Sequence, residues 1–342
     1  MSLRAENAAA PASQANGTTG PRPGSGPACA ANDDKLTPPA PSLLSFDVEE
    51  YFHVEAAAGR LTGDDWPGMQ QRLAPAIDRI LALLAEFGVQ ATFFVLGWVG
   101  RHERGVVQRI ADAGHEIASH GMSHAMLTRL TPAQFRQELT DSRKLLEDIS
   151  GSDVLGFRAP TFSVLHATAW ALDELEQAGY AYDSSVFPVR HDRYGVPDAP
   201  IHMHWALGPG RGNSSQGPCG GTGSPARGIL EIPPLTLRLL GANVPVGGGG
   251  YLRLLPVRLI QHAIGRCRRA GEPAMIYLHP WELDAGQPAL PMGRVARLRH
   301  RIGLSKTEAK LRWLLAHNRF GSVRAHLPAL AARAKQTYLY GR

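Results

Sequence analysis

The chain has 342 residues, of which 44% are hydrophobic and 19% are charged, and its net charge is +6. This composition is typical of a globular protein, and the lysines and arginines are not clustered, so we expect no nucleic-acid partner. No apolar run is long enough for a transmembrane segment or a signal peptide. The three cysteines, Cys29, Cys219 and Cys267, have neither a zinc-binding nor a disulfide spacing. Together these features predict a cytoplasmic protein, for which the inner face of the membrane is one expected place of action.

The first ordered segment combines an apolar strand with acidic residues. Residues 1–42 are rich in Ala, Pro, Gly and Ser, which predicts a disordered tail. The run Leu43–Phe46 predicts a buried strand, and Asp47, Glu49 and Glu50 follow at its carboxyl end. In α/β barrels, functional side chains lie at the carboxyl ends of strands, so these carboxylates are candidates for a general base and a metal ligand. A solvated acidic turn is the alternative.

Helical and strand patterns then alternate along the chain. Further strands are expected at 91–96, through Ile117, at 154–157, up to Asp183, at 228–232 and at 274–278. Amphipathic helices separate the first of these, which predicts parallel strands with right-handed crossovers, in an open sheet or a barrel. Residues 207–228 are dominated by Gly and Ser and predict a flexible insertion. Near the C-terminus, Ser305 and Glu308 have the spacing of a capping box ahead of one more helix.

Polar residues end five of the expected strands. His120 and His124 are spaced i, i+4, so their imidazoles can converge on one metal ion such as zinc. The spacing alone also fits two ordinary loop histidines. Arg158, Asp183 and His279 end three other strands, beside the acidic residues of the first. Five polar strand ends in register predict a site at one rim of a barrel.

These motifs carry a resemblance to a known family. Ser45-Phe46-Asp47, Ser119-His120-Gly121-Met122-Ser123-His124, Arg158-Ala159-Pro160, Asp183 and Leu278-His279-Pro280 resemble, in this order, the polysaccharide deacetylases (carbohydrate esterase family four, NodB homology). The sequences around Asp47 and His279 are similar to a branch that accompanies PEP-CTERM/exosortase systems and exopolysaccharide loci. The resemblance covers about residues 43–330.

The resemblance implies a fold and an activity. The fold would be an irregular (β/α)7 barrel over residues 43–285, with a C-terminal helical extension, 286–342, packed on it. The activity would be metal-dependent removal of N-acetyl groups from an N-acetylhexosamine polysaccharide, with Zn²⁺ as the most expected ion.

The resemblance also implies a metal site with one departure. His120 and His124 would be metal ligands. The family pattern has two adjacent aspartates, of which the second binds metal, whereas this chain has Asp47-Val48-Glu49-Glu50. Because side chains alternate along a strand, Asp47 and Glu49 can share a face, so we expect Glu49 as the third ligand, with Glu50 as the alternative.

The remaining roles follow from the same resemblance. Asp47 would be the general base, held by Arg158. His279 would be the general acid, oriented by Asp183. A backbone N–H near Thr161 would stabilise the oxyanion. Such a division of labour suits amide hydrolysis, in which one group takes a proton from water and another returns it to the departing nitrogen.

Two aromatic residues are candidates for sugar contacts. Tyr251 follows the glycines at 247–250, and Trp281 follows His279 by two residues. For Tyr251 an ordinary glycine-rich turn is the alternative.

Three other functions remain open from the sequence. The chain can be a glycan-binding pseudoenzyme, a hydrolase of another linear or cyclic amide, or a glycosidase that uses two carboxylates. The glycosidase would leave the three histidines without a role, and it would need no metal.

Overall fold

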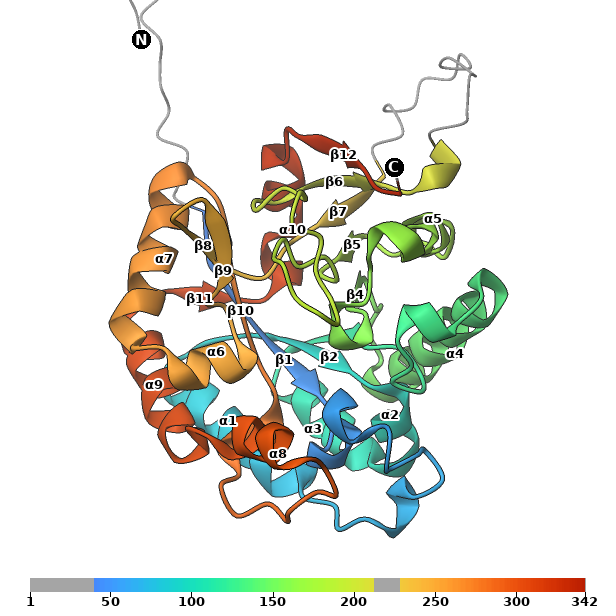
Figure 1. Ribbon diagram of the computed structural model, residues 1–342, viewed down its shortest axis with the longest axis vertical. Coiled ribbons are helices and arrows are strands. Elements are labelled where there is room, and N and C mark those ends of the chain that lie inside the picture. The colour runs from blue at the N-terminus through green and yellow to red at the C-terminus, as the bar shows by residue number, and fades with distance from the viewer. Residues whose placement is uncertain (1–39, 212–227, 342) are drawn as a thin grey trace, which may run out of the picture. The chain divides into compact units, whose positions relative to one another are not determined.

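The computed structural model describes residues 40–211 and 228–341 (Figure 1). Most of the expected tail and most of the expected insertion therefore lie outside the described residues. Seven parallel strands form the barrel: β1 (Ser42–Val48), β2 (Thr92–Val95), β3 (Glu116–Ser119), β4 (Gly156–Phe157), β5 (Tyr182–Asp183), β7 (Ile229–Glu231) and β10 (Ala274–Leu278). They are hydrogen-bonded in the order β10-β1-β2-β3-β4-β5-β7.

The barrel closes between β7 and β10 without a regular ladder. Just after β7, Pro234 forms a parallel bridge with Met275, and Gly248 forms another with Tyr277. The Leu235 N–H donates to the Met275 carbonyl over 2.9 Å. These few bonds complete the ring, so the expected irregular (β/α)7 barrel is confirmed.

Helices surround the strands. In chain order they are α1 (Leu73–Glu86), α2 (Gly97–His102), α3 (Arg104–Asp112), α4 (Pro132–Ser150), α5 (Trp170–Gln177), α6 (Gly249–Leu254), α7 (Val257–Ala270), α8 (Arg294–Arg301), α9 (Leu304–His317) and α10 (Val323–Arg333). The start of α4 is as the sequence predicts: Thr131 caps it through the Gln134 N–H, and Pro132 occupies its first turn.

Short strands outside the seven-strand ring extend the structure. β6 (His204–Leu207) runs antiparallel to β7, β12 (Thr337–Leu339) pairs with β6, β11 (Phe320–Gly321) pairs with β1, and β8 (Thr236–Leu239) forms a hairpin with β9 (Ala242–Pro245). The segment after residue 286 therefore supplies two strands as well as the helices α8, α9 and α10. No helix in the described ranges is long and apolar enough to cross a membrane.

The capping box expected at Ser305 is wrong. The helix α9 starts one residue earlier, and Gly303, in the left-handed region with φ 78°, occupies the cap position. Ser305 therefore lies inside the first turn, and Glu308 forms an ion pair with Arg79 of α1 instead. The actual cap is a glycine whose backbone, not a side chain, makes the turn.

Side chains alternate between the two faces of the barrel wall. Phe46 and Phe93 stack with ring centroids 5.0 Å apart in the main hydrophobic core, which includes buried residues of the surrounding helices. Phe94 belongs to a second cluster with Ala118 and Met275, on the other face of the strands. Because Asp47 pairs with Phe94 across β1 and β2, its side chain is directed to that inner face.

Candidate active site

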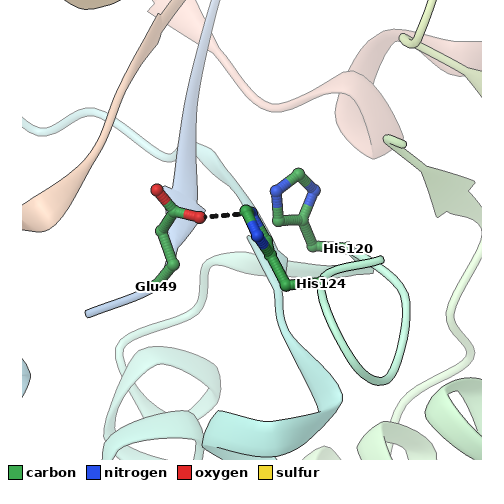
Figure 2. Close-up of side chains that lie close together, drawn as sticks. All are labelled: Glu49, His120 and His124. Atoms are coloured by element: carbon green, nitrogen blue, oxygen red, sulfur yellow. Dashed lines mark ion pairs between the residues drawn. The ribbon is translucent and has the colours of Figure 1, made fainter. Parts of the chain in front are cut away.

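Three potential metal ligands converge at the carboxyl ends of β1 and β3. One donor atom from each of Glu49, His120 and His124 lies within 4.8 Å of the other two (Figure 2). His120 follows β3 directly, and His124 lies in the next loop with a left-handed backbone, φ 60°. The His124 Nε2 is 2.6 Å from Glu49 Oε2. The structure thus brings together the three residues that the sequence predicts as ligands.

The side chain of His120 is prepared for a metal. Its Nδ1 is 2.8 Å from the Arg158 carbonyl, which can only accept, so Nδ1 carries the proton and Nε2 is left as a ligand atom. Burial lowers the pKa of His120 to about 4, despite the nearby carboxylates, so the imidazole is neutral at neutral pH. One carboxylate and two imidazoles in this arrangement fit a zinc-type ion that retains open positions.

Glu49 and Glu50 point to different places, and of the two Glu49 lies beside the two histidines. Burial alone would raise the pKa of Glu49, but the charge and hydrogen bond of His124 and the charges of other histidines lower it well below its usual range. Glu50 instead accepts hydrogen bonds from the backbone N–H groups of Arg72 and Leu73, at 2.5 and 2.9 Å. Glu50 therefore caps the start of α1, and its proposed alternative role as a ligand is wrong.

Asp47 is held by a buried arginine. The Arg158 guanidinium donates to Asp47 Oδ1 over 2.6 Å and to Ser45 Oγ over 2.9 Å. The rest of the guanidinium bonds to Ser184, and its carbon lies 4.1 Å from the ring centre of Phe94. Arg158 is fully buried, and Asp47 is 2% exposed. One carboxylate oxygen is thus fixed by a charge-assisted bond, and Oδ2 remains directed toward His279.

His279 lies between three carboxylates, with Asp47 and Glu49 near one ring nitrogen and Glu282 at the other. Its Nε2 is 3.8 Å from Asp47 Oδ2 and 3.7 Å from Glu49 Oε1. Its Nδ1 is 2.8 Å from Glu282 Oε1, and Glu282 in turn pairs with Arg253 at 2.7 Å. Burial would lower the pKa of His279, but the hydrogen bond to Glu282 and the surrounding carboxylate charges raise it to about 9. The imidazolium is therefore the form present at neutral pH.

Asp183 does not orient His279, which corrects the expectation from the sequence. Its Oδ1 accepts a hydrogen bond from Ser185, and Ser185 Oγ accepts from the Ala159 N–H over 2.7 Å. Its carboxyl group is also hydrogen-bonded to that of Glu231, and both carboxyls are buried. Burial raises the pKa of both, so the pair retains a proton. Asp183 thus secures the barrel wall, and Glu282 holds the histidine.

The ligands and His279 open into a pocket of about 520 Å³. Thr161 lines it, with φ 57° and ψ 26° in the short helix η5 (Pro160–Phe162). Among the described residues, no hydrogen bond is found for the Thr161 N–H, so this backbone donor is unused. A strained backbone at a pocket wall is typical of functional sites.

The two predicted sugar-contact residues have different surroundings. Trp281 lines the pocket, but it is only 8% exposed and lies between the rings of His279 and His300, at centroid distances of 4.9 and 4.6 Å. Its indole N–H donates to Glu49 Oε1 over 3.2 Å. Among the described residues, Tyr251 is not part of the pocket lining, and it is hydrogen-bonded to the pocket residue Tyr194. Trp281 thus orients a ligand residue, and Tyr251 supports the wall.

Sequence reasoning missed the groups that hold His279. Glu282 follows the histidine by three residues in the short helix η8 (Pro280–Leu283), and this spacing was the available signal. Arg253, at the end of α6, had no local signal, because only the fold brings it to Glu282. Ser45 and Ser184, the partners of Arg158, are likewise small residues with no distinctive spacing.

Comparisons with known proteins match this arrangement. Residues 58–182 match the family described as Polysaccharide deacetylase, and residues 184–328 match a Domain of unknown function (DUF3473). A structure titled as a putative polysaccharide deacetylase from Mycobacterium smegmatis has the same fold, with a TM-score of 0.53 at 20% identity, covering 89% of this chain and 98% of that one.

Curated relatives are similar over less than half of the chain. A chitooligosaccharide deacetylase from Rhizobium leguminosarum bv. phaseoli is 31% identical over 43% of this chain and 69% of its own length. A peptidoglycan-N-acetylglucosamine deacetylase from Bacillus cereus is 30% identical over 37% of this chain and 46% of its own. The chain spans less than two thirds of the length of this and several other curated relatives. The motifs, the barrel and these matches together establish that the chain belongs to the polysaccharide deacetylase family.

Proposed function

We propose that this protein is a metal-dependent hydrolase that removes N-acetyl groups from an N-acetylhexosamine polysaccharide, in the biosynthesis of an exopolysaccharide. The observation that carries the proposal is the convergence of Glu49, His120 and His124 beside the Asp47–Arg158 pair and His279. The family's named members are deacetylases of peptidoglycan or chitooligosaccharides. The branch resemblance of the sequence motifs is what favours an exopolysaccharide.

The three ligand residues would hold the ion, with Zn²⁺ as the most expected one. When bound, such an ion polarises the acetyl carbonyl and lowers the pKa of water at the site. Glu49 would bind through its carboxylate, which the Trp281 indole N–H holds in position. The Nε2 of His120 is presented by the Arg158 carbonyl.

Asp47 takes the proton from the attacking water. Arg158 occupies Oδ1, so the proton is accepted at Oδ2, the oxygen that faces His279. The fixed guanidinium also prevents rotation of the carboxylate. The Thr161 N–H provides a backbone donor for the negative charge that develops on the acetyl oxygen.

His279 returns a proton to the departing amine. Its Nε2 carries that proton into the pocket, and Glu282 holds the opposite nitrogen at 2.8 Å. A general acid must be protonated before the reaction, and the raised pKa, about 9, meets this requirement. Asp47 and His279 lie on the same side of the pocket. The group that accepts the proton from water is therefore close to the group that donates a proton to the amine.

Acetate release tests the proposal. Metal-stripped protein, the same protein with zinc restored, and His120→Ala with zinc would be incubated with N-acetylglucosamine oligomers and with acetylated exopolysaccharide. We expect acetate only from the zinc-restored wild type. Zinc binding without acetate from any polymer would favour the pseudoenzyme or a hydrolase of another amide. Acetate from stripped protein would contradict metal dependence.

The cytoplasmic location stays a prediction. It would be tested by fractionation of the native organism with an antibody against the chain. Recovery outside the cell would contradict it.

A further inference from the structure

Exposed apolar side chains gather at one place on the described surface. Six large hydrophobic residues of the described surface are strongly exposed. Four of them lie in or next to α8 or at the end of α6: Leu254, Val295, Leu298 and Ile302. Their exposed fractions are 55%, 64%, 65% and 38%. Single exposed leucines are ordinary, but a contiguous group indicates an interaction surface.

The helix α8 directs its apolar side outward. Val295 and Leu298 are spaced i, i+3 on one helical face, and Ile302 is the first residue after the helix. The opposite face carries His300, which is buried against Trp281 and hydrogen-bonded to Gln287 at 2.9 Å. In an ordinary surface helix the apolar face is the buried one, so this arrangement is inverted.

Leu254 lies at the end of α6, which is joined to the end of α8. Its neighbour Arg253 donates to the carbonyls of His300 and Ile302, at 2.6 and 3.0 Å, and so joins the end of α6 to the end of α8. The buried Arg253–Glu282 pair fixes this junction. The apolar surface is therefore held rigidly and does not depend on a loose loop.

Arginines flank the apolar face. The sequence of α8, Arg294-Val-Ala-Arg-Leu-Arg-His-Arg301, contains four arginines and no acidic residue. Among the described residues, none of these four arginines forms an ion pair. Along the helix, Arg294 and Arg301 lie on one side of the Val295–Leu298 stripe and Arg299 lies on the other. A basic helix with an outward apolar face has the character of an interfacial membrane helix.

We propose that α8 and the end of α6 dock onto an anionic lipid surface. The arginines would contact lipid headgroups, and Leu254, Val295, Leu298 and Ile302 would enter the boundary between headgroups and acyl chains. A second copy of the chain is disfavoured as the occupant, because a twofold contact would bring the two sets of arginines together. An acidic polysaccharide would satisfy the arginines but would leave the apolar stripe in water.

The docking surface adjoins the pocket. Val295, Ala296 and Arg299 line the pocket as well as belonging to α8. Docking would therefore bring the pocket mouth to the lipid surface, where a membrane-attached glycan chain would be presented. The docking itself does not depend on the deacetylase activity, so the two proposals can fail separately.

Vesicle co-sedimentation tests the docking. The full chain would be mixed with vesicles of phosphatidylglycerol and phosphatidylcholine, or of phosphatidylcholine alone. Leu298→Asp and Leu298→Ser change the centre of the stripe. The matched control is Leu240→Asp, which changes a fully exposed leucine in the turn of the β8–β9 hairpin, and Figure 1 shows this hairpin apart from α8.

We expect wild type and Leu240→Asp to bind anionic vesicles, with much weaker binding to phosphatidylcholine. Leu298→Ser should weaken binding roughly tenfold, and Leu298→Asp should weaken it further, because a charge enters the lipid boundary. Both variants should retain the wild-type melting temperature and zinc content. The proposal is overturned if wild type does not bind, or if the Leu240 and Leu298 variants lose binding equally. If wild type dimerises and Leu298→Asp abolishes the dimer, the surface binds a second copy of the chain. If wild type binds only soluble alginate, the surface binds an acidic polysaccharide. Either result would overturn the proposal.

Discussion

The two halves of the pocket are built by different means. In the first half, the candidate ligand His120 and the pair Asp47–Arg158 lie at the ends of the parallel strands β3, β1 and β4, and the barrel itself sets their positions. In the second half, His279 is positioned by a side chain three residues away, Glu282, which a distant arginine secures. A functional residue at a strand end can be predicted from its order in the sequence. The residue that positions it through a side-chain hydrogen bond can differ from the one that the sequence order predicts.

Two carboxylates show this difference most clearly. Asp183 ends β5 where the family pattern expects the partner of the acid, yet it bonds to Ser185 and Glu231. Glu282 has taken the contact to His279. Each variant below tests one half of the pocket against the other.

The largest effect is expected for Glu49→Gln, with Glu50→Ala as its contrast. A neutral amide is a poor metal ligand, so zinc affinity and acetate release should fall by more than roughly 100-fold. Glu50→Ala should retain zinc and lose about 1 kcal/mol of stability, because the N–H groups of Arg72 and Leu73 lose their acceptor. Isothermal titration and urea unfolding measure the two effects. Zinc loss in the Glu50 variant alone would reverse the assignment.

Glu282→Gln tests the partner of the acid. An uncharged partner stabilises the imidazolium less, so kcat should fall by about 10²-fold or more. Because Glu282 raises the pKa of His279, its removal should move the alkaline limb of kcat/KM to lower pH. Asp183→Asn should leave that limb in place. A shift of the limb with Asp183→Asn and not with Glu282→Gln would restore the role that the sequence assigned to Asp183.

Trp281→Phe tests the hydrogen bond to Glu49. Phenylalanine preserves the packing between the histidine rings but cannot donate to Oε1. Loss of such a supporting contact should weaken zinc binding by about tenfold. KM for long oligomers should change little, since the indole is almost buried. An increase in KM without any loss of zinc affinity would indicate that the indole contacts sugar.

The smallest effect concerns the pH dependence of stability. Asp183 and Glu231 have raised pKa values when folded, so the folded state holds more protons than the unfolded state above about pH 4. Their contribution to stability therefore falls as pH rises through this range. The lowered pKa values of buried histidines such as His204 act in the opposite direction.

The comparison of wild type with Asp183→Asn isolates the carboxyl pair. Urea unfolding at about pH 5 and about pH 8 should show the variant gaining about 1 kcal/mol relative to wild type at the higher pH. A constant difference between the two proteins would mean that the pair does not share a proton.

Much of the site could be predicted because its residues follow strands directly. Period-two alternation placed Asp47 and Glu49 on one face, and the structure shows Glu50 on the other. The partner of His279 could not be predicted, because Arg253 and Glu282 meet only through the packing of α6 against η8 and α8. The outward direction of the apolar residues of α8 could not be predicted either, because the apolar stripe of a surface helix normally faces the core.

The closure of the barrel has a consequence for biosynthesis of the protein. Ser45 of β1 bonds to Ile276 of β10, 231 residues away, and β10 also delivers His279. A nascent chain that ends before β10 can contain the three candidate metal ligands and the proposed general base, but not the proposed acid. Because such long-range pairing forms late, we expect zinc uptake to precede catalytic competence during synthesis on the ribosome.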